Sequence, residues 1–460
     1  MRTVFLWAVA LLAGCTVGPK YEKPAVELPE AWKEAAPRFA EDGRWWRIYA
    51  DSQLEATIDE AMASNGDLVV AAARVDEARA VLDEANSFFW PSVSAQATAS
   101  RQQVSTRTAT FFSGIPREYS SHRATLNVSY ELDLFGRLRS NAAAARAELE
   151  ANEAAREAVR LALAAQVARS YFALRALDEQ VLLTRRTVAL REEALALQRR
   201  RLQGGVISEF DLRQLEAEAA VVRAQLPPLE RDREREEVAL SVLLGRSPKQ
   251  VFEGNVKVKE AVDETPGPPA VPSGLPSELL LRRPDLVEAE RVLAAANARI
   301  GVARAEMFPS IALTGFLGSE SAALSNLFSG GAAATWQIAA SVTQPIFEGG
   351  RLQARTEAAE ARERAAVAQY QQAIRSAFGE VRSALIAQSR ARESYEAESA
   401  RANALVESLR LARLRYQNGV ASQLDVLDAE RGLLAAQIAR VDALRAHRAA
   451  VADLFRALGG

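Results

Sequence analysis

The chain of 460 residues contains few side chains that could carry out chemistry. His122 and His447 are its only histidines and stand in unrelated sequence contexts, and Cys15 is its only cysteine. The sequence has no glycine-rich loop with the lysine that would hold a phosphate. The chain therefore has too few histidines for a histidine-based metal site or a catalytic triad, and its single cysteine cannot form a disulfide within the chain. We expect neither an enzyme nor a resident cofactor.

The single cysteine follows a sequence typical of a lipid-modified amino terminus. An apolar run over residues 4–12 leads through Ala13-Gly14 to Cys15. A stretch this short cannot span a bilayer and is typical of a secretory signal. The segment resembles a bacterial lipobox, which predicts removal of residues 1–14 and a covalent lipid on Cys15; an ordinary signal with an incidental cysteine is the alternative. Thr16, where an aspartate would retain a lipoprotein in the inner membrane, favours the outer membrane.

The charge balance excludes another class of function. The chain carries 57 basic and 59 acidic residues, which argues against a nucleic-acid partner because such partners are bound through an excess of positive charge. No apolar run reaches 18 residues, so the sequence predicts no membrane-spanning helix.

Two segments, at residues 201–212 and 415–426, are nearly the same. Six of their twelve positions are identical. Each has a glycine that can adopt positive φ, a serine that can cap a new helix, and then an acidic residue. They predict one tight helix–turn–helix tip, used twice. The tip residues are Gly204, Gly205, Val206 and Ser208 in the first copy and Asn418, Gly419, Val420 and Ser422 in the second.

The duplication extends to whole halves of the chain. Gly136-Arg137-Leu138 matches Gly350-Arg351-Leu352, and the order of strand pair, long helix, tip and helix recurs. We therefore expect an extended amino-terminal segment and two repeats joined by a linker rich in proline. The predicted bounds are 15–50 for the segment, 51–253 for the first repeat, 254–277 for the linker and 278–460 for the second repeat.

Each repeat contains a run of 67 residues that predicts one long helix. Residues 137–203 include no proline or glycine, and residues 351–417 include only Gly379. Such helices reach roughly 100 Å at ~1.5 Å per residue and are too polar for lipid, so they must cross an aqueous space. An apolar seam with a period of seven predicts coiled-coil packing. It consists of Val167, Leu174, Val181, Val188, Leu195 and Leu202, matched in the second half by Val381, Gln388, Tyr395, Ala402, Leu409 and Tyr416.

The helices after the two tips are expected to differ. The second runs from Ser422 to about Ala457 without a proline, whereas the first meets Pro227-Pro228. Because a proline inside a helix costs roughly 3 kcal/mol, we expect the first helix to break or kink there. An irregular outer belt is expected near this break and the linker.

Four segments alternate apolar and polar residues, at about 92–102, 124–134, 310–318 and 336–346. Roughly ten residues with a period of two is typical of one span of an outer-membrane barrel, although a half-buried soluble sheet shows the same alternation. Four strands cannot close a barrel, and open edges are not tolerated in lipid. The chain must then oligomerise, and two, three or four copies would supply eight, twelve or sixteen strands.

One long stretch is the most specific part of the sequence. It comprises Leu275-Pro-Ser-Glu-Leu-Leu-Leu-Arg-Arg-Pro-Asp285, Glu288–Arg291, Ala295–Ala298, Ile300-Gly301, Ala303–Ala305 and Phe308–Ser310. With the two tips, it makes the mature chain resemble the outer-membrane factor (TolC) family of efflux channels, in the NodT-like lipoprotein branch. The resemblance implies a mainly α fold with a small β part. Three copies would form a 12-stranded outer-membrane β-barrel continued by a periplasmic α-helical barrel.

The resemblance also implies a function and a set of partners. The chain would be the passive exit duct of a tripartite efflux system for drugs or other small compounds. It would be anchored in outer-membrane lipid and would meet a periplasmic adaptor and an inner-membrane pump, which the family implies to be of the RND type. The alternatives are a periplasmic coiled-coil adaptor and a structural lipoprotein of an envelope complex. Neither alternative would carry this paired set of amphipathic strands and long helices.

The resemblance assigns a periplasmic gate to the second hairpin. Leu424 would form an apolar ring in the trimer, Asp428 an acidic ring, and Arg431 would partner Asp428. Aspartates that face one axis repel each other unless neutralised, and Arg431 lies three residues on, on the same helix face. An ordinary surface ion pair is the alternative. The tips would meet the adaptor, with the first hairpin as a fixed frame against which the second moves.

Overall fold

The computed structural model describes residues 16–25, 43–107, 116–254, 256, 258 and 283–460. The predicted signal, Cys15 and most of the predicted linker lie outside these residues. Contacts divide the chain into two compact units. The first unit contains residues 1–25, 74–153 and 288–371, and the second contains residues 26–73, 154–287 and 372–460.

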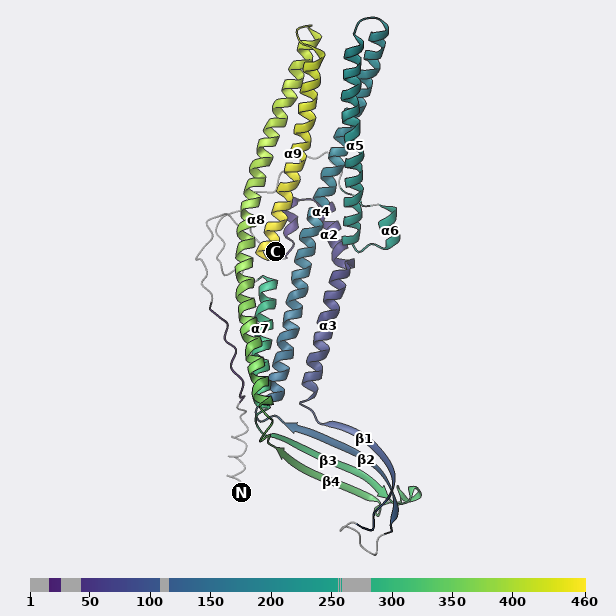
Figure 1. Ribbon diagram of the computed structural model, residues 1–460, viewed down its shortest axis with the longest axis vertical. Helices are drawn as coiled ribbons and strands as arrows, with labels where there is room; N and C mark the ends of the chain where they lie inside the picture. The colour runs from purple at the N-terminus through teal and green to yellow at the C-terminus, as the bar shows by residue number, and fades with distance from the viewer. Residues whose placement is uncertain (1–15, 26–42, 108–115, 255, 257, 259–282) are drawn as a thin grey trace. The chain divides into compact units, whose positions relative to one another are not determined.

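The described residues are mostly helical, with one antiparallel sheet, as expected for a mainly α fold (Figure 1). In chain order the elements are η1 (Trp45–Tyr49), α2 (Ser52–Ser64), α3 (Gly66–Ser87), β1 (Ser92–Gln103), β2 (Glu118–Leu132), α4 (Arg137–Gln203), α5 (Glu209–Leu243), α6 (Pro248–Glu253), α7 (Pro284–Ala305), β3 (Ser310–Ser321), η3 (Leu324–Asn326), β4 (Ala334–Thr343), α8 (Arg351–Gln417) and α9 (Gln423–Leu458).

The sheet belongs to the first unit and is a meander in the order β1-β2-β3-β4, with β1 and β4 at its edges. Its register aligns the apolar alternates across the strands, since Leu126 pairs with Ala95 and Leu317, and Leu317 pairs with Trp336. One face is therefore apolar, and its large side chains are exposed. They include Val93, Leu126, Val128, Leu317, Trp336, Ile338 and Val342.

Several strand bounds differ by two or more residues from those expected from alternation, and two of these differences have a clear cause. β2 begins at Glu118, ahead of the expected start near 124, because β1 stays paired with it as far as Gln103 opposite Glu118. β4 ends at Thr343, short of the expected 346, because Pro345 has no N–H to donate to the ladder. The start of β2 thus depends on its pairing with β1, which the alternation of apolar and polar residues does not reveal.

The two long helices α4 and α8 have the bounds predicted from sequence. Along the α4 seam, Val167, Leu174, Val181 and Leu195 are buried. None of the described helices is long and apolar enough to cross a membrane.

The second unit has a core in which η1 and α2 pack against α4, α5 and α9. Trp45 of η1 stacks on Phe455 of α9 with ring centroids 5.3 Å apart. Asp51 caps α2 and also binds Arg175 of α4, whose Nη1 lies 2.9 Å from the carboxylate. Tyr171 donates its hydroxyl to the same carboxylate. Because a buried charge is tolerated only when it is paired and hydrogen-bonded, this contact ties the amino-terminal helices to α4.

The predicted break at Pro227-Pro228 is wrong, because α5 is one helix from Glu209 to Leu243 with both prolines inside it. The carbonyls that lose their partners belong to Arg223 and Ala224, which are exposed and accessible to water. Ion pairs to α4 also hold α5 on either side of the prolines. They are Arg223–Glu192 before them, and Arg185–Glu230 and Arg233–Asp178 after them.

Candidate functional site

The candidate site lies in the second unit, where two helical hairpins, α4–α5 and α8–α9, end in their tips. Gly205 and Gly419 have φ of 70° and 75°, the left-handed region that favours glycine. The backbone N–H of Val206 bonds to Arg201 and that of Val420 bonds to Arg415, both at 2.9 Å. The two tips therefore end their helices with the same hydrogen-bond pattern.

After each tip, the next helix begins with the same kind of capping box. The hydroxyl of Ser208 accepts from the N–H of Asp211, and the Asp211 carboxylate accepts from Ser208; Ser422 and Asp425 repeat this arrangement. The backbone N–H of Ser422 lowers the pKa of the Asp425 carboxyl, and the Ser422 hydroxyl adds to this shift. The exposed side chains at the tips, Val206 and Phe210 in one and Val420 and Leu424 in the other, differ in bulk.

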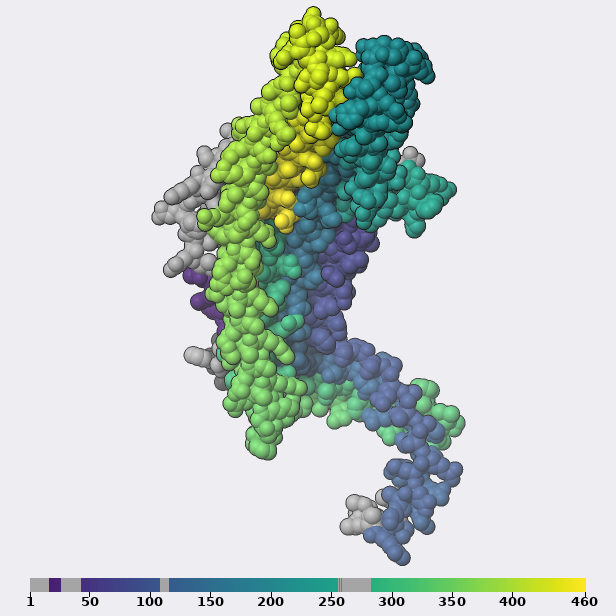
Figure 2. Space-filling model, turned by 45° about the horizontal axis from the view of Figure 1, so that its top comes forward, coloured from purple at the N-terminus to yellow at the C-terminus, as the bar shows by residue number. Residues whose placement is uncertain are grey.

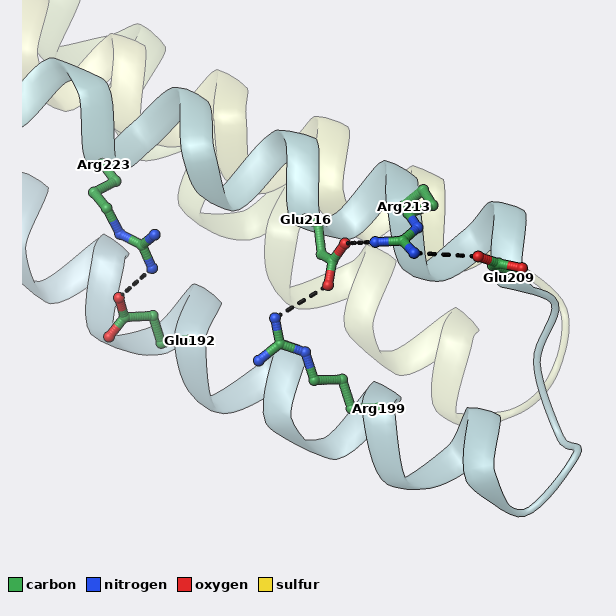
Figure 3. Close-up of polar contacts among 6 residues, drawn as sticks. All are labelled: Glu192, Arg199, Glu209, Arg213, Glu216 and Arg223. Atoms are coloured by element: carbon green, nitrogen blue, oxygen red, sulfur yellow. Dashed lines mark hydrogen bonds and ion pairs between the residues drawn. The ribbon is translucent and has the colours of Figure 1, made fainter.

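The helices of the first hairpin are joined by ion pairs that cross from α4 to α5 (Figure 3). Near the tip, Arg199 of α4 binds Glu216 of α5 at 3.1 Å, and Arg213 also binds Glu216, at 2.9 Å. The Arg199 hydrogen bond, followed by that of Arg213, lowers the pKa of Glu216. We call these crossing pairs the first ladder; they are Arg185–Glu230, Arg199–Glu216, Arg223–Glu192 and Arg233–Asp178.

The second hairpin is joined differently. Of the ion pairs among the described residues, only Arg413–Glu430, at 2.9 Å, crosses from α8 to α9. Four other arginines of the distal part of α8 bind glutamates three or four residues away on the same helix. These pairs are Arg390–Glu393, Arg392–Glu396, Arg401–Glu398 and Arg410–Glu407. Such pairs satisfy the charges of α8 without holding it to α9.

The two hairpins lie side by side (Figures 1 and 2) and meet at a buried arginine. Arg191 of α4 is 5% exposed; its Nη1 lies 3.2 Å from the Glu430 carboxylate of α9, and its Nη2 donates to the Leu427 carbonyl at 3.4 Å. Glu430 thus serves two arginines, because it also binds Arg413. Nearer the tips, Gln198 bonds to Gln423 at 2.8 Å.

The structure places the predicted gate residues on the face of α9 next to this contact. Asp428 and Arg431 form an ion pair at 2.9 Å, with more than half of each side chain exposed. Arg431 also approaches Glu218 of the first hairpin, at 3.9 Å. Leu424 is 47% exposed, in the first turns of α9. In a single chain these side chains are therefore partly exposed and accessible to a neighbouring copy.

A cavity of about 340 Å³ lies between the hairpins behind the predicted gate. Glu218 and Val222 of α5 line it on one side, and Glu430, Arg431 and Leu434 of α9 on the other, with Arg191 at its base. Close-packed helices would leave no such space. The hairpins are therefore packed less tightly here than at their tips, where Leu195, Leu212, Leu215 and Leu427 form one apolar cluster.

Sequence reasoning missed Arg191 and Glu430, although a signal for Arg191 was present. Three residues after four of the six apolar seam positions, where a coiled coil also expects an apolar side chain, α4 carries polar residues that are buried. They are Ser170, Thr184, Arg191 and Gln198. A charged residue on a buried seam indicates a partner, but Glu430 lies on the other hairpin, where spacing gives no guide. In the described part of the chain, no group of three His, Cys, Asp or Glu side chains could hold a metal.

The sheet exposes an apolar face, and the helical hairpins carry many charged side chains; both features are expected of an outer-membrane channel protein. Residues 57–246 and 275–460 match the outer membrane efflux protein family, and the chain belongs to that family. It is 36% identical to the outer membrane protein OprJ of Pseudomonas aeruginosa, over 98% of this chain and 93% of OprJ.

Two further comparisons agree with this membership. The chain is 32% identical to the probable outer membrane lipoprotein SilC of Salmonella typhimurium, over 100% of this chain and 98% of SilC. Its fold matches the solved CmeC outer membrane channel of Campylobacter jejuni with a TM-score of 0.89, at 26% identity over 97% of this chain and 95% of that chain. The predicted family, fold class and outer-membrane location are confirmed.

Proposed function

We propose that the chain forms, as a homotrimer, the passive outer-membrane exit duct of a tripartite efflux system. The observation that carries the proposal is the sheet, which exposes one apolar face and leaves β1 and β4 unpaired at its edges. Unpaired edges are excluded from lipid, so neighbouring copies must supply the missing strands. Three copies supply twelve strands, which leaves a lumen lined by the polar alternates, whereas eight strands would be filled by side chains.

The rest of the proposed assembly follows from the same chain. Cys15 carries a lipid that holds the amino terminus in the outer membrane, as the name of the lipoprotein SilC suggests for that relative. The duct has no cofactor and catalyses no reaction, so an inner-membrane pump must supply the energy and a periplasmic adaptor must join the two. An adaptor or a structural lipoprotein would not need an apolar sheet face.

Conductance and mass test the duct directly. The purified protein should have the mass of three chains and should produce single-channel currents in planar bilayers. A monomer without conductance would overturn the proposal.

We further propose that the two tips bind the adaptor and that Leu424, Asp428 and Arg431 close the duct. The exposed side chains of the tips and the hydrogen-bonded capping boxes behind them support a docking role. Replacing Gly205 and Gly419 with bulky residues should abolish capture of the adaptor by the purified trimer. The matched control is Gly379→Leu in α8, where an added Cβ atom meets nothing within 4 Å. Adaptor capture retained by the tip variants would contradict the docking role.

A further inference from the structure

The segment that follows the predicted lipid site forms one wall of a groove in the first unit. The groove has a volume of about 390 Å³. Thr16, Gly18 and Tyr21 of the segment line it together with Ser140 of α4 and Gly301 of α7. Sequence analysis singled out Gly301 as part of the most specific stretch but gave it no role.

Two glycines bring the segment and α7 into backbone contact. A Cβ atom at Gly18 would lie 2.8 Å from Cα of Gly301, and one at Gly301 would lie 2.6 Å from Oγ of Ser140 and 3.3 Å from Cα of Gly18. Neither glycine has positive φ, so neither is required by a turn. The contact leaves no room for these atoms, since carbon atoms approach to about 3.5 Å. Both positions therefore need glycine because the backbones of the segment and α7 approach each other closely there.

The segment is also held at both of its ends. Near the β2–α4 junction, the N–H of Val17 donates to the carbonyl of Phe135 at 3.4 Å, and a Cβ atom at Gly136 would meet Thr16 at 2.8 Å. Six residues farther along, Lys23 donates to Glu290 of α7 at 2.5 Å. This hydrogen bond is the largest cause of the raised pKa of Lys23. The segment is thus docked along its length.

We propose that Gly18 and Gly301 are positioning residues for the lipid anchor. Their close approach seats residues 16–25 on α7 and holds Thr16 at the junction where the apolar sheet gives way to polar helix. The proposal rests on the proposed lipidation of Cys15, which is one peptide bond, or about 3.8 Å between Cα atoms, before Thr16. The lipid then sets the depth of the sheet in the membrane, which a free tether of the same length could not do.

Trypsin cleavage after Lys20 measures the docking, because a segment packed against α7 resists a protease. Lys20 is exposed, and the bond after Lys23 is blocked by Pro24. In the full-length protein purified from membranes, Gly18→Ala and Gly301→Ala should each speed release of the peptide of residues 15–20 by at least about tenfold, the ratio expected for about 1.4 kcal/mol of lost docking. Gly379→Ala, in a helix interior where an added Cβ meets nothing, should leave the rate unchanged.

A second substitution distinguishes loss of the Gly18–Gly301 contact, which we call the seat, from a general loss of stability. Ser140→Gly removes the Oγ and Cβ atoms that an alanine at 301 would meet at 2.6 and 3.1 Å, so it should slow the cleavage of Gly301→Ala; the rate should stay above that of the wild type because the contact with Cα of Gly18 at 3.3 Å remains. It should not rescue Gly18→Ala, whose added atom meets the backbone of Gly301. Equal cleavage rates in all variants, or rescue of both, would overturn the seat.

The mass of the released peptide separates this inference from the lipid proposal. An acylated peptide with altered cleavage rates supports both proposals. An unacylated peptide refutes the lipid on Cys15, and with it the positioning role, even if the cleavage rates show a seat. An acylated peptide released equally fast from every variant refutes the seat alone.

Discussion

The two hairpins of the second unit share one tip but are held together by different means. In the first, the ladder of ion pairs binds α4 to α5 from Asp178 to Glu216. In the second, a single described ion pair crosses from α8 to α9, and its acid, Glu430, is shared with Arg191 of the first hairpin. By its ion pairs, the second hairpin is therefore joined to the first hairpin about as strongly as its own two helices are joined to each other.

This difference in ion pairs gives a physical reason why the first hairpin would be a fixed frame and the second hairpin the part that moves. Exposed ion pairs are individually weak, and several of them acting on one pair of helices restrict sliding more than one does. The first hairpin suits the role of a frame. The second can change its position by exchanging a few polar contacts around Glu430, next to a cavity that leaves room for movement.

The largest effect is expected from removing the shared acid. Glu430→Ala leaves Arg191 buried without its carboxylate, which should lower the free energy of unfolding by about 3 kcal/mol. Urea unfolding of the detergent-solubilised protein, followed by circular dichroism, measures this loss. Glu407→Ala removes an exposed acid that binds only within α8 and serves as the control. If both variants unfold at the same urea concentration, Glu430 does not join the hairpins.

A second prediction concerns the frame. Replacing Pro227 and Pro228 with alanine restores two helical hydrogen bonds and should stabilise the protein by about 2 kcal/mol, after allowing for the more flexible unfolded chain. The control is Pro248→Ala, because Pro248 occupies the first turn of α6, where proline is favourable. An unchanged urea midpoint would contradict this prediction and would mean that Pro227 and Pro228 do not destabilise α5 when the first ladder holds it to α4.

A third prediction uses pH to weaken the second hairpin alone. His447 of α9 is buried beside Tyr395 of α8, and it faces Arg392 and Glu396 of α8 and Arg448 of α9. Burial, followed by the charges of Arg392 and Arg448, lowers the pKa of His447. Below about pH 6.5 the unfolded chain therefore binds a proton that the folded chain does not, so folding stability is lost as the pH falls.

His447→Phe should remove this part of the pH dependence, measured as the change in urea midpoint between pH 7.5 and 5.5. His122→Gln, in β2, should retain it. A wild-type dependence that survives His447→Phe would show that other groups cause the loss.

Much of this fold could be predicted because its elements depend on local signals. The long helices begin and end where glycine and serine stand, and the repeated tip predicted both turns. The prediction failed at Pro227-Pro228, because contacts with α4 outweigh a local penalty. The Arg191–Glu430 pair escaped prediction because its partners lie 239 positions apart on different hairpins. The role of Gly301 escaped it because close approach to Gly18 is a property of packing.

The central claim is that the second hairpin moves and the first is its frame. Single-channel conductance of the reconstituted protein tests it most directly, with Asp428→Ala/Arg431→Ala compared against Arg199→Ala/Glu216→Ala in the first ladder. Removing an exposed pair worth about 0.5 kcal/mol from each of three copies should shift the ratio of open to closed channels about tenfold. We predict this increase in current for the Asp428/Arg431 variant and none for the ladder variant. Unchanged conductance in the former, or an equal rise in both, would contradict the account.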